Sequence, residues 1–526
     1  MDQVESLMFA NFCGHKSKYY MSDNKRIAKN TMFLYFRMLL IMGVSLYMSR
    51  VVLDKLGVED YGLYNVVGGV VTMLSFLSGT LSTGSSRFIT YQLGANDNEL
   101  LKRTFSTTIF THVILSIFIV VIMESVGLWF FYNKLVIPED RFYACLWVFH
   151  ISIITTVISI CQVPYTSLIM AHEEMGIYAK ISIFDVFARL GICYMLSVID
   201  ADKLILYAIL LLLVQIIVVS LYVVSCIRKF CESRHLRSFD SKVFRQLMSF
   251  SGWNIMANLS ETLGRQGIII LINMFLTPVV VAAQSLAGQV SSAVMLFVNN
   301  FRTAINPQVI KLYASGDEAG SRKLTLNTTI YCFDLILMIG LPAIFVMDTL
   351  MRLWLVEVPE YAVVFTQWII IRQILGTFSA SFYIPMIAAN KMKINSIAAV
   401  FLGIGEFIFL YFLLKHGLGP MWIQYLGVVV VVVFSMIVKP YVLIKEINYS
   451  LVEIIRCYLT CLEVLLLSLL FSLPFVIFLS NSILQSIMKV IAVVIAVLIS
   501  SYLCLGKNEK KILLTYVGKK ISNYRS

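Results

Sequence analysis

The stretch LGVEDYGLYNVVGGVV at residues 56–71 recurs in altered form as LTPVVVAAQSLAGQVS at residues 276–291. Superposing the two stretches matches identical residues in the pairs Leu56/Leu276, Gly68/Gly288 and Val70/Val290. Further matches follow at nearly the same spacing of about 220 residues, among them Pro138/Pro359, Trp147/Trp368 and Pro164/Pro385. Apolar composition alone does not readily produce collinear matches of proline, tryptophan and glycine. The sequence therefore predicts an internal duplication.

The composition is typical of an integral membrane protein rather than of a soluble one. Of the 526 residues, 59% are apolar and 14% are charged, whereas soluble domains carry about 25% charged residues. A transmembrane helix needs about 20 apolar residues, and such runs recur along nearly the whole chain. We predict an all-α polytopic membrane protein with about fourteen transmembrane helices, at residues 31–54, 63–84, 106–131, 142–170, 176–198, 203–226, 247–273, 279–301, 326–347, 362–389, 394–414, 421–444, 457–479 and 483–505.

The duplication and the loop charges predict the domain organisation. Each repeat holds six helices, an even number, so both repeats insert in the same orientation and a substrate site is expected between them. Lys and Arg concentrate in the loops of one side, which places both termini in the cytoplasm. The predicted parts are a cytoplasmic segment 1–30, a first bundle 31–227, a basic linker 228–246, a second bundle 247–445, two additional helices 446–505 and a basic cytoplasmic tail 506–526. Residues 1–20 show no periodicity and are expected to be disordered, and Met21 is an alternative start to Met1.

Polar residues inside the predicted helices indicate an internal cavity. A charge at the bilayer centre costs roughly 2.5–3.5 kcal/mol on insertion scales, so such residues are expected to face a cavity or to pair. On the seventh predicted helix the polar residues follow one helical stripe, and polar stripes also run along the second and eighth helices. The stripe residues are Asn254, Asn258, Glu261 and Arg265 on the seventh helix, Asn65 and Thr72 on the second, and Gln289 and Asn299 on the eighth.

Structural interpretations compete with this one. Asp185/Arg189 and Glu261/Arg265 are i,i+4 pairs that could simply neutralise one another. The small residues of the second helix could serve close packing, and Arg37 could reach the interface from its position near a helix end.

Enzyme chemistry is not indicated. The sequence has no GxxxxGK[ST] loop, which argues against direct use of ATP, and it has no HExxH motif or Cys/His zinc spacing. The ten cysteines are scattered and are expected to be structural. The net charge of +12 follows the loops of one side and does not indicate nucleic-acid binding. We predict no catalytic residue, no metal and no cofactor.

Two regions resemble polysaccharide repeat-unit flippases of the Wzx type, which belong to the multidrug/oligosaccharidyl-lipid/polysaccharide exporter superfamily. The first is KNTMFLYFRMLLIMGVSLYMSRVVLDKLGVEDYGLYNVVGGVVTMLSFL (29–77) with SSRFITYQLGANDNELLKRTF (85–105). The second is MSFSGWNIMANLS (248–260) with AINPQVIKLYASGDEAGSRKLT (304–325). The likeness covers about residues 25–450 and does not specify the sugar.

The resemblance implies a MATE-like fold of two six-helix bundles in a V around a central cavity, working by alternating access. It implies an undecaprenyl-pyrophosphate-linked oligosaccharide as cargo, for O-antigen or capsule synthesis, and a bacterial inner-membrane location beside polymerase and chain-length proteins. Cationic cavity residues would hold the pyrophosphate, and the candidates are Arg37, Arg265 and Arg302. The embedded acids Asp185, Glu261, Asp334 and Glu406 are candidates for ion coupling.

Other functions remain open from the sequence. A drug/cation antiporter and a lipid II flippase share the expected fold. From another class, a membrane-embedded sugar polymerase or acyltransferase is the alternative, and the internal duplication argues against it.

Overall fold

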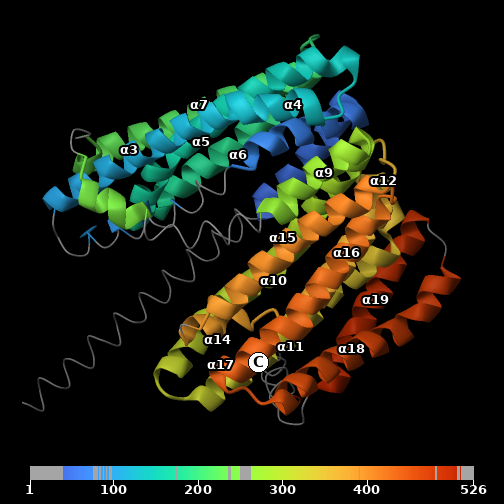
Figure 1. The fold of residues 1–526 in the computed structure, drawn as a ribbon. Helices are drawn as coiled ribbons and strands as arrows, with labels where there is room; N and C mark the ends of the chain where they lie inside the picture. Colours follow the sequence, from blue (N-terminus) through green and yellow to red (C-terminus); the bar gives the residue numbers. More distant parts are fainter. Residues whose placement is uncertain are drawn as a thin grey trace, which may run out of the picture.

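The computed structural model describes residues 39–74, 98–172, 174–234, 239–248, 262–389, 391–479 and 482–505, with isolated positions at 81, 85–86, 88–89, 92–93 and 510. Within these residues the protein is all-helical, with no strand. The helices form two bundles that diverge from one end of the molecule, as Figure 1 shows. The predicted two-bundle, V-shaped fold class is confirmed.

The first bundle consists of long apolar helices joined by short turns. Residues 39–72 are helical, with the left-handed residue Gly57 (φ 80°) between the two predicted spans. Asp202 begins the last helix of the bundle by accepting hydrogen bonds from the amides of Leu204 (3.0 Å) and Ile205 (3.2 Å), as an N-cap residue does. The remaining elements are α3 (Asn98–Ile122), η1 (Met123–Gly127), α4 (Leu128–Lys134), η2 (Glu139–Arg141), α5 (Phe142–Ala171), α6 (Met175–Val198) and α7 (Lys203–Lys229).

The second bundle follows η3 (Cys231–Arg234) and a short helix at 241–248. Pro278 stands at the start of its longest helix, where its fixed φ suits a first helical turn. Asp317 caps the next helix by accepting from the Gly320 amide at 2.8 Å. The elements are η4 (Leu263–Gly267), α9 (Ile268–Phe275), α10 (Pro278–Ala314), α11 (Glu318–Phe345), α12 (Met347–Trp354), α13 (Ala362–Thr377), α14 (Tyr383–Ala388), α15 (Lys393–Lys415), α16 (Met421–Val432), η5 (Val433–Val438) and α17 (Lys439–Ile447).

Two further helices, α18 (Leu451–Phe478) and α19 (Ile483–Cys504), pack against each other and against α11. They lie on the outside of the second bundle in Figure 1. Ser486 of α19 and Thr349 of α12 approach within 3.1 Å through their hydroxyl groups. This pair of helices is thus attached to the second bundle alone among the described residues.

The predicted helix positions agree well with the observed ones. Within the described residues, ten helices are long and apolar enough to cross a membrane, and two shorter apolar ones lie at Leu263–Phe275 and Ala362–Thr377. The number fourteen stays a prediction, because residues 1–38, most of 75–97 and 249–261 are not described. Several boundaries differ: α10 runs to Ala314, beyond the predicted end at 301, and α11 begins at Glu318, before the predicted start at 326. The predicted helix 362–389 is divided into α13 and α14 by turns at residues 378–382, and Pro385 lies in the first turn of α14, where its missing amide proton is not required.

The bundles meet at the end formed by α4, α9 and α12, which we call the converged end (Figure 1). Asn273 of α9 is fully buried there, and its amide accepts from the Val136 amide at 3.1 Å and donates to the Val136 carbonyl at 3.2 Å. The indole of Trp354 donates to the carbonyl of Leu46 at 2.8 Å. Polar contacts therefore hold the bundles together at this end.

Backbone also touches backbone at the converged end. A Cβ placed on Gly62 would lie 2.1 Å from the carbonyl oxygen of Pro278, at the start of α10. Only glycine fits such an approach. The opposite end of the V, where α7 ends and where α10 turns into α11, is called the open end below.

Candidate substrate cavity

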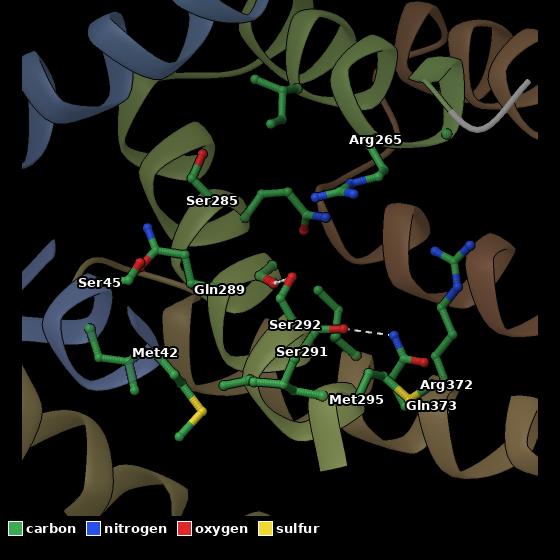
Figure 2. Close-up of a pocket in the computed structure, with 18 of the residues that line it drawn as sticks. Met42, Ser45, Arg265, Ser285, Gln289, Ser291, Ser292, Met295, Arg372 and Gln373 are labelled. Carbon is green, nitrogen blue, oxygen red and sulfur yellow. Dashed lines mark hydrogen bonds between the residues drawn. The ribbon is translucent and has the colours of Figure 1, made fainter. Parts of the chain in front are cut away.

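A cavity of about 1030 Å³ lies between the bundles. Its walls come from the helix at 39–72 of the first bundle and from η4, α9, α10, α13 and α16 of the second. In Figure 2, Met42 and Ser45 of the first bundle lie on one side of this space and Arg265 and Arg372 on the other. The cavity is therefore shared by both bundles, with the larger part of its wall on the second.

Amide and hydroxyl side chains make up most of the polar wall. They are Ser45, Asn65, Gln266, Gln284, Ser285, Gln289, Ser291, Ser292, Asn299 and Gln373.

Hydrogen bonds fix several of these groups. The Gln373 amide donates to the Ser291 hydroxyl at 2.6 Å, drawn as a dashed line in Figure 2. The Gln289 amide donates to the Tyr61 hydroxyl at 2.8 Å and accepts from the Ser49 hydroxyl. Because Tyr61 and Ser49 belong to the first bundle and Gln289 to α10, this cluster also links the bundles beside the cavity.

The charged part of the described wall is entirely positive. Arg265, from the π-helical turn η4, and Arg372, from α13, line the cavity, and no described lining residue is acidic. π-Helical turns recur at functional sites. Arginine keeps its charge in proteins, so the described wall carries two permanent positive charges. Such a cavity suits an anion.

Arg372 is held by a buried partner behind the wall. Its guanidinium lies 3.3 Å from the carboxylate of Glu406 on α15, and the side chains are 26% and 4% exposed, respectively. A Cβ on Gly427 would lie 2.6 Å from the same guanidinium, so the glycine provides the space that Arg372 occupies. The arginine thus has one side on a buried acid and another on the cavity.

The sequence-predicted cavity residues fall into three groups. Asn65, Arg265, Gln289 and Asn299 line the cavity. Two others do not line it: the Thr72 hydroxyl donates to the carbonyl of Gly69 at 3.3 Å, and the Arg302 guanidinium donates to the Asn299 side chain at 3.4 Å, one turn along α10 from the cavity. The predicted residues Arg37, Asn254, Asn258 and Glu261 lie outside the described residues.

None of the described acidic candidates lines the cavity. Asp185 pairs with Arg189 at 2.8 Å one turn along α6, which is the mutual neutralisation considered above. Glu406 lies behind the wall on Arg372. Asp334 borders a separate pocket between α11 and the α18–α19 pair, and its role in ion coupling stays a prediction. The helix period alone could not distinguish this pocket from the central cavity.

Sequence reasoning missed part of the wall. Ser45, Gln266, Gln284, Ser291, Arg372 and Gln373 all line the cavity and were not candidates. Arg372 was recognisable as a charge embedded in an apolar helix, and Glu406 as another. Their contact across two helices gives no signal in the spacing of either helix.

Comparison with protein-family models identifies the family of this chain. The family model described as polysaccharide biosynthesis protein matches residues 27–313, more than half of the chain. The chain belongs to this family. Its resemblance to repeat-unit flippases, noted from the sequence, is thereby confirmed. No curated protein sequence matched the chain.

Solved structures show the same fold at low sequence identity. The lipid II flippase MurJ, in an inward closed conformation, superposes with a TM-score of 0.67 at 14% identity, covering 90% of this chain and 98% of that chain. An inward-facing multidrug resistance MATE family transporter of the MOP superfamily gives 0.64 at 13% identity, covering 78% and 97%. A MOP superfamily transporter from Pyrococcus furiosus gives 0.56 at 14% identity, covering 79% and 95%.

Family and fold together define the class of protein. This member of the polysaccharide biosynthesis family is a multi-pass membrane protein with the two-bundle fold of flippases and exporters.

Proposed function

We propose that the protein is a flippase for an undecaprenyl-pyrophosphate-linked oligosaccharide, acting in a bacterial inner membrane during surface polysaccharide synthesis. The observation that supports this proposal is the charge of the described cavity wall, which has two arginines and no acid. A diphosphate linker carries about two negative charges, and arginine forks bind phosphate oxygens with paired hydrogen bonds. The positive sign of the wall is opposite to that of the linker, and of its two arginines Arg372 also serves the buried carboxylate of Glu406.

The neutral part of the wall suits the sugar. Amides and hydroxyls offer both donors and acceptors, and the Gln284, Gln289 and Ser292 side chains line the cavity together. Ligand sites in proteins commonly have volumes of roughly 300–1,000 Å³, and this cavity of about 1030 Å³ lies just above that range. A bulky polar head group therefore fits the space, while the lipid tail remains in the bilayer.

The membrane potential provides the driving force in this proposal, given the orientation of the protein in the membrane. The Lys/Arg-rich loops place the open end at the cytoplasm, where lipid-linked precursors would enter. Moving about two negative charges outward along an inside-negative potential of roughly 100 mV gains about 4–5 kcal/mol. The membrane potential would then favour outward flipping. Flipping in vesicles that does not respond to an imposed potential would contradict this part and favour ion exchange.

The cavity charge argues against a drug/cation antiporter, since a cationic drug requires an acidic or neutral wall. A lipid II flippase would need the same diphosphate chemistry, and the two candidates differ in the sugar. In cells, loss of the protein should remove surface glycan and leave its lipid-linked precursor on the inner leaflet. Absence of that precursor would place the protein earlier in synthesis, and accumulation of lipid II instead would favour the second candidate.

Arg265 offers a direct test of the site. Arg265→Ala should lower glycan export at unchanged protein abundance, because one of the two cavity charges is lost. Arg265→Lys should restore export only in part, since a lysine cannot form the paired contact. The matched control is Arg352→Ala on α12, because Arg352 pairs with Asp348 at 3.0 Å on the exposed surface. Full export by Arg265→Ala would remove this residue from the site.

A further inference from the structure

A second polar pocket lies between α11 and the α18–α19 pair. Its polar lining comes from three helices, with Asn327, Tyr331 and Asp334 from α11, Thr460 from α18 and Ser501 from α19. Its volume is about 30 Å³, enough for one body the size of a water molecule. None of its lining residues borders the central cavity.

Two side-chain atoms at this pocket lack partners. The Ser501 side chain lies close enough to Asp334 to interact with its carboxylate, but the Asp334 Oδ1 and Ser501 Oγ atoms are buried and neither forms a hydrogen bond of normal geometry within the described residues. None of the ion pairs among the described residues includes Asp334. Buried polar atoms are nearly always satisfied in native proteins, so a further partner that bridges these two groups would complete their bonding.

The neighbouring titratable groups do not balance the carboxylate. The thiols of Cys461 on α18 and Cys504 on α19 lie within electrostatic range of Asp334. Glu463 lies near Cys504 and adds negative charge. Lys510 also lies near Cys504, where its ammonium donates to the Leu503 carbonyl at 2.9 Å, and it is not among the groups that interact with Asp334. The pocket therefore carries an acid whose charge, within the described residues, is not paired.

The donors at the pocket define the class of ligand. Carboxylate, hydroxyl and amide oxygens are hard ligands and prefer alkali or alkaline-earth cations to transition metals. A divalent ion usually requires several carboxylates, and the described residues hold no group of three His, Cys, Asp or Glu side chains able to bind a metal. A single acid balances a single positive charge.

We propose that this pocket binds a sodium-sized monovalent cation, held by Asp334, Ser501 and the neighbouring oxygens of Thr460 and Asn327. The cation satisfies both unpartnered atoms and neutralises the buried carboxylate. Because its ligands come from three helices, it fastens the α18–α19 pair to the second bundle. This site is separate from the central cavity and does not depend on the proposed transport function.

Cation binding can be followed through the melting temperature of the purified full-length protein in detergent. Sodium that binds only the folded protein raises its melting temperature in a saturable manner, by roughly 2–5 °C. The titration replaces choline chloride with sodium chloride at constant ionic strength and pH, with potassium chloride as a test of size. We expect stabilisation by sodium, a smaller effect of potassium and none of choline. Equal melting temperatures in all three salts would overturn the proposal.

Variants locate the effect. Asp334→Asn keeps the side-chain shape but loses the charge, and its melting temperature should no longer respond to sodium. Ser501→Ala should raise the half-saturating sodium concentration roughly five- to tenfold. The matched control is Asp348→Asn, which alters an exposed acid on α12 and should keep the full sodium response.

Two results would contradict the assignment. A sodium response that persists in Asp334→Asn would place the cation elsewhere. Stabilisation of the wild type by acid, without any response to sodium, would show that Asp334 holds a proton instead of a metal cation. The wild-type titration remains decisive even if a variant fails to fold.

Discussion

Substituting Gly62 by alanine should separate the bundles at the converged end. The new Cβ would lie 2.1 Å from the carbonyl oxygen of Pro278 and 2.8 Å from its carbonyl carbon. Carbon–oxygen contacts normally close to about 3.3 Å, so the overlap is roughly 1.2 Å. Both partners are backbone atoms, which cannot rotate away as a side chain can. The strain must move the helix that carries Gly62 away from α10.

The magnitude follows from the cost of overpacking. Inserted methyl groups in well-packed sites cost typically 1–3 kcal/mol. Here the cost falls only on the conformation in which the converged end is closed, because the contact exists only there. The population ratio of closed to separated states should therefore fall roughly 5- to 150-fold. The conformation in which the bundles approach each other at the open end and separate at the converged end should become more populated.

Distances across the open end report this shift. Spin labels on Arg228, at the end of α7, and Ser315, in the turn after α10, are both on exposed positions and belong to different bundles. Gly62→Ala should increase the short-distance component of the measured distribution. Gly68→Ala is the matched control, because it lies on the same helix with nothing within 4 Å of its added Cβ. An unchanged distribution in Gly62→Ala, or the same change in Gly68→Ala, would refute the reasoning.

Two further predictions concern buried polar partners. Arg372→Ala alone should lower the unfolding free energy by about 3–5 kcal/mol, because it leaves the Glu406 carboxylate buried and unpaired. The double variant with Glu406→Gln should recover most of that stability without recovering glycan export. Thermal melts and export assays measure both effects, and equal stability of the single and double variants would contradict the pairing. Asn273→Ala should cost about 1–3 kcal/mol, since it removes the partners of the Val136 amide and carbonyl. Asn133→Ala is its control, because Asn133 is exposed and donates only within its own helix, and a comparable loss there would argue against a specific link at Asn273.

Much of the architecture was predictable from the sequence, because membrane helices follow directly from the length of apolar runs. The predicted spans 142–170 and 203–226 correspond to α5 (Phe142–Ala171) and α7 (Lys203–Lys229). The quoted stretches also indicated the family, and the family match confirms it. Polar stripes pointed to Asn65, Gln289 and Arg265, which all line the cavity.

The direction in which each embedded charge points was not predictable in the same way. In a soluble helix the polar face marks the solvent side, but a helix that is apolar on every side carries no such mark. Asp334 and Glu406 are both acids inside apolar helices, yet one borders a pocket against α18 and α19 and the other pairs with Arg372 behind the cavity wall. Their difference arises from contacts between helices far apart in the sequence.

The sequence by itself determined that this protein lies in a membrane and that it belongs to the polysaccharide biosynthesis family, and it predicts that the two halves are related. Those properties depend on composition, local spacing and inherited motifs, which are all present before the chain folds. Only the tertiary structure decided which charges share a cavity and which neutralise one another. Electrostatic pairing acts over a few ångströms in space, and only the packing of the helices brings such residues within that distance.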